Sequence, residues 1–136
     1  MKLLIANRGE IAIRISRAAA GLNIPTVAVY PEDDIDSLHT KKADSAVVLR
    51  GAGAAAYLDI DQMINLAKQS GCNAIHPGYG FLSENADFAR KCEFAGLIFV
   101  GPRTETLEIL GDKAKARALA QRCGVPVLKG SAGAVT

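Results

Sequence analysis

A glycine-rich stretch, His76 to Asn85, carries residue types that suit a binding loop, and it reads HPGYGFLSEN. It follows a short apolar run and precedes a helical pattern that extends to about Phe94. Two glycines and one proline within five positions favour a tight, exposed loop with unusual backbone angles. Because open α/β sheets bind ligands at the carboxyl ends of their strands, this loop is a candidate site. A plain connection between a strand and a helix is the alternative.

The polar side chains of this loop do not by themselves indicate catalysis. His76 ends the strand before Pro77, and a lone histidine there is more often a hydrogen-bonded structural residue than a base. Ser83 is a natural N-cap for the helix that follows, and Glu84 suits the positive first turn of that helix. No Ser-His-Asp set or metal-ligand cluster can be assembled from the sequence, so we expect no catalytic residue and no metal site here.

The stretch Asn7 to Glu10 follows the first apolar run and places backbone amides at the start of a helix. Such a junction can hold an anion. It contains only Gly9 and therefore lacks the G-x-G-x-x-G pattern of dinucleotide-binding folds. Arg8 could face a ligand or pair with a nearby carboxylate, and chemistry alone favours the structural role.

Lys113 follows Gly111 and Asp112 at the predicted start of a helix. A cation in the first turn opposes the helix dipole, so a bound phosphate is a candidate for what favours it there. Simple solvation of the lysine is the alternative. The small-residue stretch 51–56 is predicted to be a loop, because no Lys-Ser or Lys-Thr follows it to make a phosphate-binding P-loop.

Composition excludes several classes of protein. The 136 residues are 49% hydrophobic with a net charge of +2, and no basic run indicates nucleic-acid binding. No signal peptide is evident, and no apolar stretch approaches the length of a membrane span. The three cysteines form no C-x-x-C motif, so we expect buried or half-buried thiols in a reducing compartment, which favours the cytoplasm.

Short apolar runs alternate with helical patterns along the chain. This alternation predicts an α/β fold, a Rossmann-like doubly wound parallel sheet with right-handed crossovers. Arg14 and Arg17 are three apart in the first helix and therefore share a neighbouring face. Strands are predicted over 3–6, 26–30, 46–49, 74–75, 97–100 and 125–128, and helices over 11–22, 60–69, 84–94, 104–110 and 113–122, with one or two helical turns within 35–42.

Four motifs, considered together, resemble biotin carboxylase, the ATP-grasp component of the biotin-dependent carboxylases. They are Ala6–Ala12, His76–Asn85, Phe99–Pro102 and Gly111–Lys113, in the order and spacing of that family. The resemblance covers nearly the whole chain. It implies the N-terminal pre-ATP-grasp domain over residues 1–111 and the start of the ATP-grasp region over residues 112–136.

The resemblance also implies an activity for the parent enzyme. Enzymes of this family use MgATP to activate bicarbonate as carboxyphosphate, and then carboxylate N1 of biotin held on a carrier protein. The reaction is that of a ligase forming a C–N bond, with ATP, Mg²⁺ and biotin as cofactors. The implied partners are the remainder of the biotin carboxylase chain, the biotin carboxyl carrier protein, a carboxyltransferase, and a second copy in a homodimer.

Residue by residue, the resemblance assigns roles to positions that match the family's motifs. Lys113 matches the lysine that contacts ATP phosphate. Tyr79 and Gly80 match positions on the biotin and bicarbonate side of the site, and Arg14 and Arg17 match positions near the dimer interface, Arg17 being the stronger match. His76, Gly78 and Glu84 belong to the same loop as Tyr79, which Glu84 is expected to support.

The family's glycine-rich ATP lid, adenine pocket, Mg-binding glutamates, and catalytic and bicarbonate-binding arginines lie beyond Thr136. We therefore expect the 136-residue chain to be inactive alone. A stand-alone module that binds a nucleotide or anion, or docks on another subunit, is the alternative. Another ATP-grasp ligase, such as a carbamoyl-phosphate or purine-pathway enzyme, shares the early fold, but the HPGYGFLSEN stretch argues against it.

Overall fold

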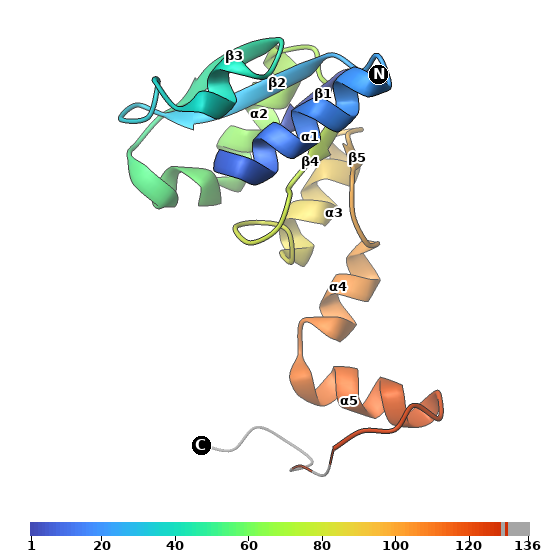
Figure 1. Ribbon diagram of the computed structural model, residues 1–136. Helices are drawn as coiled ribbons and strands as arrows, with labels where there is room; N and C mark the ends of the chain where they lie inside the picture. The colour runs from blue at the N-terminus through green and yellow to red at the C-terminus, as the bar shows by residue number, and fades with distance from the viewer. Residues whose placement is uncertain (129, 131–136) are drawn as a thin grey trace. The chain divides into compact units, whose positions relative to one another are not determined.

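The computed structural model describes residues 1–128 and 130, which belong to two compact units, Met1–Gly101 and Pro102–Thr136. The first unit holds a five-stranded sheet, and the second holds two helices (Figure 1). The domain boundary after residue 111 rests on the resemblance and stays a prediction.

All strands of the sheet are parallel, in the order β3-β2-β1-β4-β5, as the α/β prediction requires. In register, Leu4 of β1 lies between Val27 of β2 and Ile75 of β4. The elements of this unit are β1 (Leu3–Ile5), α1 (Gly9–Gly21), β2 (Thr26–Pro31), η1 (Leu38–Lys41), β3 (Ser45–Leu49), η2 (Gly53–Leu58), α2 (Ile60–Gln69), β4 (Ala74–His76), α3 (Ala86–Phe94) and β5 (Ile98–Phe99).

Both faces of the sheet are covered, which explains why the central strand β1 is apolar throughout. Successive strand residues point to opposite faces, so β1 sends Leu3 and Ile5 toward α1 and Leu4 toward α2 and α3. Figure 1 shows α1 on one face and α2 and α3 on the other. Beneath α1 the core contains Ile15 and Ala19. The opposite core contains, among others, Val27, Val29, Tyr57, Met63, Ile75 and Phe88.

The helix after the glycine-rich loop begins later than the sequence suggested. Ser83 was predicted to be its N-cap, but the cap is Asn85, whose side chain accepts a hydrogen bond from the Phe88 N–H at 2.9 Å. The Ser83 N–H instead donates to the Gly80 carbonyl at 2.9 Å, which continues the loop as a turn. The prediction was wrong because both residue types cap helices equally well, and only the turn separates them.

Replacing Asn85 by alanine is expected to lower the free energy of unfolding by about 1 kcal/mol, the usual loss for an N-cap. Ser83→Ala is the matched control, and we expect a change within about 0.5 kcal/mol, since the capping bond of this helix comes from Asn85. Urea unfolding of both variants measures the difference. A larger loss for Ser83→Ala than for Asn85→Ala would contradict the observed helix start.

The second unit contains α4 (Thr104–Leu110) and α5 (Lys113–Arg122), both as predicted. The predicted strand over 125–128 is wrong. Instead, the Val125 N–H donates to the Ala120 carbonyl at 2.9 Å, and the Arg117 side chain donates to the Leu128 carbonyl at 3.0 Å. Pro126 has no N–H to offer a ladder, so these residues bond to α5.

Two other predictions need correction. The stretch after Ala52 is the 3₁₀ helix η2 and not a loop throughout, and it buries Tyr57 in the core. Cys72 and Cys92 are buried free thiols as predicted, but Cys123 is exposed. Cys123 follows α5, a helix that buries none of its residues. Burial raises the pKa of the Cys92 thiol to about 12, so it stays protonated near neutral pH.

Candidate functional site

The candidate site lies at the topological switch point of the sheet, where successive connections run to opposite sides. From β1 the chain crosses to β2 on one side, and from β4 it crosses to β5 on the other. Because β1 and β4 are neighbours, their following loops separate at the carboxyl edge and leave the position at which open α/β sheets bind ligands. The loop after β1 is 6–8, and the loop after β4 is 77–85.

Asn7 joins these two loops across 70 positions of the sequence. Its Nδ2 donates to the Pro77 carbonyl at 2.7 Å and to the Tyr79 carbonyl at 2.8 Å. Its Oδ1 accepts the Arg8 N–H at 2.8 Å. Asn7 is only 2% exposed, so these bonds satisfy an amide that would be costly to bury alone. The first loop therefore fixes the backbone of the second.

Tyr79 points out of the loop and is 60% exposed. Its hydroxyl donates to Oε1 of Glu10 at 3.0 Å, and Glu10 belongs to the first turn of α1. The hydrogen bond to this carboxylate raises the pKa of the Tyr79 phenol above its ordinary value. A carboxylate is favoured at this place because the helix N-terminus carries partial positive charge.

His76 takes the structural role that the sequence favoured. Its Nδ1 accepts the Gly78 N–H at 3.0 Å, so the neutral ring carries its proton on Nε2. Partial burial lowers the pKa of the His76 imidazole, which keeps it neutral near pH 7. Gly78 and Gly80 both adopt a φ of +67°, the left-handed region that glycine enters without strain.

Phe81 packs the glycine-rich loop against the core cluster that contains Tyr57. Its ring stacks on Tyr57 with a centroid separation of 4.9 Å, and the Arg8 guanidinium lies 5.8 Å from its centroid. Phe81 has a φ of 44°, unusual for a residue with a side chain, and the packing of its ring stabilises that conformation. Arg8 thus contacts an aromatic face, which is neither of the two roles expected for it from the sequence.

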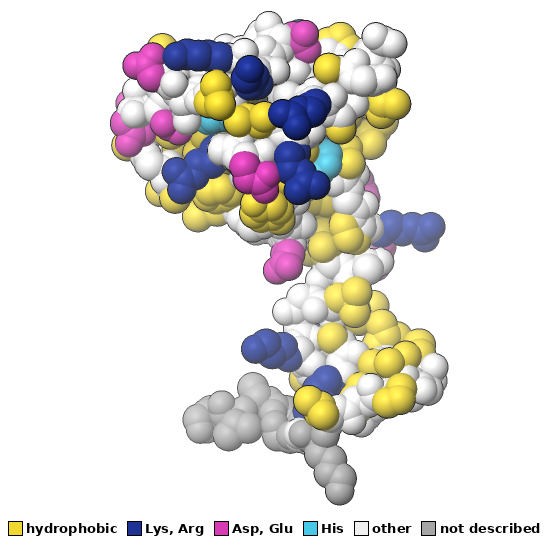
Figure 2. All heavy atoms as spheres, in the orientation of Figure 1, with side chains coloured by type: hydrophobic (Ala, Val, Ile, Leu, Met, Phe, Trp, Pro, Cys, Tyr) yellow, Lys and Arg dark blue, Asp and Glu magenta, His cyan; other side chains and the backbone are white. Residues whose placement is uncertain are grey.

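The remaining predicted residues of the first unit are exposed. Glu84 makes no hydrogen bond or ion pair within the part of the chain that the structure describes. Arg14 and Arg17 lie on the outer face of α1, where Figure 2 shows basic side chains beside hydrophobic ones. Arg14 borders an apolar hollow of about 340 Å³, whose lining includes Met1, Ile11, Ile15, Leu22, Ile24 and Val100.

Lys113 is the first residue of α5, in the second unit, and is exposed. Asp112 caps this helix, accepting the N–H groups of Ala114 at 2.9 Å and Lys115 at 3.0 Å. These bonds, above all that from Lys115, hold the pKa of the Asp112 carboxyl below its ordinary value. The carboxylate next to Lys113 offsets the unfavourable placement of a cation at the helix start, so a phosphate is not needed to explain Lys113 there.

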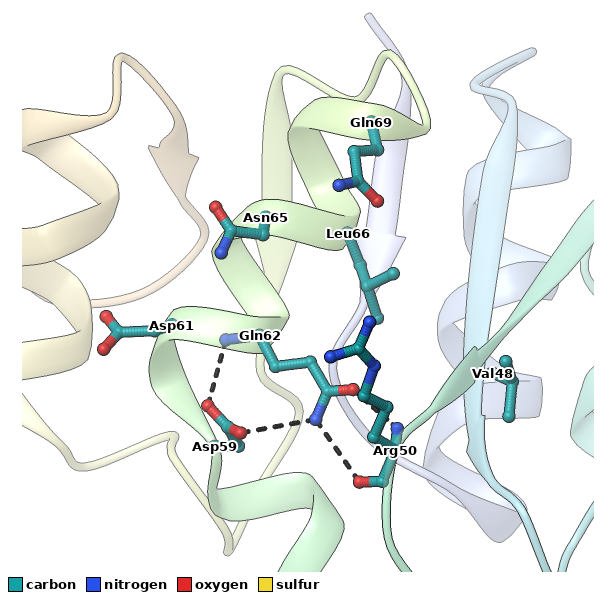
Figure 3. A pocket seen from close by; sticks show the side chains of 8 residues that line it. All are labelled: Val48, Arg50, Asp59, Asp61, Gln62, Asn65, Leu66 and Gln69. Carbon is teal, nitrogen blue, oxygen red and sulfur yellow. Dashed lines mark hydrogen bonds between the residues drawn. The ribbon is translucent and has the colours of Figure 1, made fainter.

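A second hollow of about 490 Å³ lies between α2 and the end of β3 and is lined by none of the predicted residues (Figure 3). The Gln62 carboxamide pairs there with the backbone of Arg50, accepting its N–H and donating to its carbonyl at 3.4 Å. Asp59 caps α2 by accepting the Gln62 N–H at 3.0 Å. These contacts secure the edge of the sheet, so we place the candidate site at the β1 and β4 loops.

Comparison with known proteins identifies the family. The family description "Biotin carboxylase, N-terminal domain" matches residues 1–107. This chain belongs to the biotin carboxylase family. It is 56% identical to pyruvate carboxylase of Bacillus subtilis over 135 residues, covering 97% of this chain and 12% of that protein. The chain therefore spans only a small part of that relative.

Solved biotin carboxylase domains share the fold. The "Biotin Carboxylase domain of single-chain bacterial carboxylase" matches with a TM-score of 0.95 and 58% identity, over 99% of this chain and 31% of that one. The biotin carboxylase domain of a thermophilic 2-oxoglutarate carboxylase bound to bicarbonate matches with a TM-score of 0.93 and 46% identity, over 97% of this chain and 30% of that one. These matches confirm the α/β prediction and the resemblance.

Two residues that contact the glycine-rich loop were not predicted to do so. Asn7 and Glu10 both contact the glycine-rich loop, yet they were expected to belong only to the junction after the first strand. A polar Asn7 directly after a buried strand was the one available signal. Among the described residues there is no cluster of three groups suited to a metal ion, and no helix has the length and apolar character to cross a membrane.

Proposed function

We propose that this chain is the N-terminal part of an ATP-dependent biotin carboxylase, a ligase that uses MgATP and bicarbonate to carboxylate carrier-bound biotin. The family match over residues 1–107 carries this proposal. The position of the HPGYGFLSEN loop at the switch point of the sheet supports it. The chain's partners are then the rest of the enzyme, the biotin carboxyl carrier protein, a carboxyltransferase and a second copy. Its buried free thiols suit the cytoplasm.

Within this function, the loop residues form one wall of the site. The exposed ring of Tyr79 offers a flat apolar face for a ring-shaped ligand such as biotin. Gly78 and Gly80 keep side chains away from the ligand, and His76 supports the loop through its bond to the Gly78 N–H. The supporting role expected of Glu84 has no contact behind it among the described residues. MgATP, when bound, supplies the phosphoryl group that activates bicarbonate, and the exposed ammonium of Lys113 is a suitable contact for its phosphate. Arg14 and Arg17 would lie near the dimer interface.

The proposal is tested by placing residues 1–136 in a biotin carboxylase of the family, in place of its own N-terminal segment. We expect the joined enzyme to cleave ATP in a bicarbonate-dependent reaction and to carboxylate biotin, and the isolated chain to do neither. Lys113→Ala is expected to raise the KM for ATP by about 10- to 100-fold, since a charged hydrogen bond is lost. Lys115→Ala, two residues further along an exposed helix, is the control.

Calorimetric titration of MgATP into the isolated chain distinguishes the N-terminal part of an enzyme from a stand-alone binding module. No binding agrees with one wall of a site that the rest of the enzyme completes. Clear binding that Lys113→Ala abolishes would favour a stand-alone nucleotide-binding module. A folded but inactive joined enzyme would overturn the biotin carboxylase proposal itself.

A further inference from the structure

The first junction of the chain holds Tyr79 at two separate points. Asn7 donates to its backbone carbonyl at 2.8 Å, and Glu10 accepts from its hydroxyl at 3.0 Å. The phenol ring lies between these two contacts and remains 60% exposed. The backbone and the hydroxyl of Tyr79 are both held, while its ring is open to solvent. This arrangement suits a ring that contacts a ligand.

Asn7 makes this arrangement rigid because no polar atom of its side chain is left over for another orientation. Its Oδ1 accepts the Arg8 N–H, and both protons of Nδ2 are engaged by the Pro77 and Tyr79 carbonyls. The residue is buried, so an alternative rotamer would leave an amide without partners. The close approach of Gly78 to Asn7 confirms that the two loops are in direct contact.

The position of Glu10 at the start of α1 suits a carboxylate that accepts the hydrogen bond from the Tyr79 hydroxyl. It lies in the first turn of α1, where the helix dipole favours negative charge. The charged groups that act on the Tyr79 phenol are Glu10 and, one turn further along α1, Arg14, and Glu10 has the larger effect. The hydroxyl therefore has one preferred partner among the described residues.

A purely structural reason for the contact between Tyr79 and Glu10 is weak. The ring of Tyr79 adds nothing to either core cluster, and a hydrogen bond between exposed side chains contributes little to folding. Ordering an exposed tyrosine also costs side-chain entropy. The contact with Glu10 is better explained by the orientation that it imposes on the ring.

We propose that Asn7 and Glu10 are positioning residues, which hold the ring of Tyr79 in the orientation that receives the biotin ring. The inference deepens the proposed function and rests on it for the identity of the ligand. Asn7 fixes the backbone of the loop, and Glu10 fixes the direction of the phenol. Both residues act through Tyr79 in this proposal, and neither is assigned a contact with the substrate.

The first test measures the ring in the isolated chain. Carbon-13 labelling of its three tyrosine rings, with Tyr79→Phe for assignment, allows NMR of the Tyr79 signals. In Glu10→Ala we expect Tyr79 to lose its contacts with the first turn of α1 and to deprotonate at lower pH, because the carboxylate that raises its pKa is gone. Glu10→Gln keeps the acceptor and should keep the ring in place. Glu93→Ala, an exposed glutamate on α3, is the control.

The second test uses the joined enzyme described above. Glu10→Ala and Asn7→Ala are expected to raise the KM for free biotin about threefold to tenfold, with kcat within about twofold, as expected for a lost orienting hydrogen bond. Glu10→Gln should restore the KM. Glu93→Ala should leave both constants unchanged.

The outcomes separate the two proposals. Unchanged Tyr79 ring contacts in Glu10→Ala would overturn the positioning role, whatever the joined enzyme does. A displaced ring with an unchanged KM for biotin would overturn its link to biotin. An unsubstituted joined enzyme that folds but is inactive would overturn the proposed function, and the NMR result would still decide whether Glu10 holds the ring.

Discussion

Replacing Phe88 by alanine is expected to lower the free energy of unfolding of this chain by about 3 to 5 kcal/mol. Phe88 is 0% exposed and lies in the larger core cluster, where its ring meets Phe99 edge to face at a centroid distance of 5.7 Å. Its removal leaves a cavity between α3 and the sheet, and the lost contacts add to the lost burial. Since the total free energy of unfolding of a small domain is about 5 to 15 kcal/mol, the substitution removes a large share of the stability.

Phe94→Ala is the matched control, because Phe94 ends the same helix but is 86% exposed. Its substitution should change the free energy of unfolding by less than about 0.5 kcal/mol. Urea unfolding followed by far-UV circular dichroism gives both values. Equal losses for the two variants would show that α3 does not pack on the sheet through Phe88.

The order of strands and helices could be predicted from local patterns. Continuous apolar runs such as Leu3–Ala6 indicate strands buried on both faces, and helical spacing with caps such as Asp112 indicates the helices between them. Errors arose where local signals were ambiguous. Ser83 and Asn85 are equivalent as caps on chemistry alone, and the apolar stretch 125–128 has strand-like composition but hydrogen bonds to α5.

The location of the glycine-rich loop was predictable for a different reason. A loop after a buried strand must lie at the carboxyl edge of a parallel sheet, so His76–Asn85 could be placed there from the sequence alone. The residues that bond to that loop could not be predicted in the same way. Asn7 meets Pro77 across 70 positions, and nothing in the local sequence of either stretch indicates a bond between them. Such contacts follow from the strand order, which places β1 beside β4.

The second large effect is expected at Gly78, because this position tests the contact between the two loops. Gly78 has a φ of +67°, and a Cβ built on it would lie 2.7 Å from Nδ2 of Asn7 and 3.2 Å from its Cβ. Asn7 cannot move aside, since it is buried and bonded to both neighbouring carbonyls. Gly78→Ala should therefore break these bonds and add backbone strain, lowering the free energy of unfolding by about 2 to 4 kcal/mol.

Gly80→Ala is the control that separates the backbone strain of a left-handed residue from the steric contact with Asn7. Gly80 has the same φ of +67°, but a Cβ there would meet nothing within 4 Å. Its substitution should cost only the strain of a left-handed alanine, about 1 kcal/mol. The difference between the two variants in urea unfolding therefore measures the contact of Gly78 with Asn7. Equal costs would mean that Asn7 yields to the added methyl group, and that the first loop does not hold the second as firmly as the positioning of Tyr79 requires.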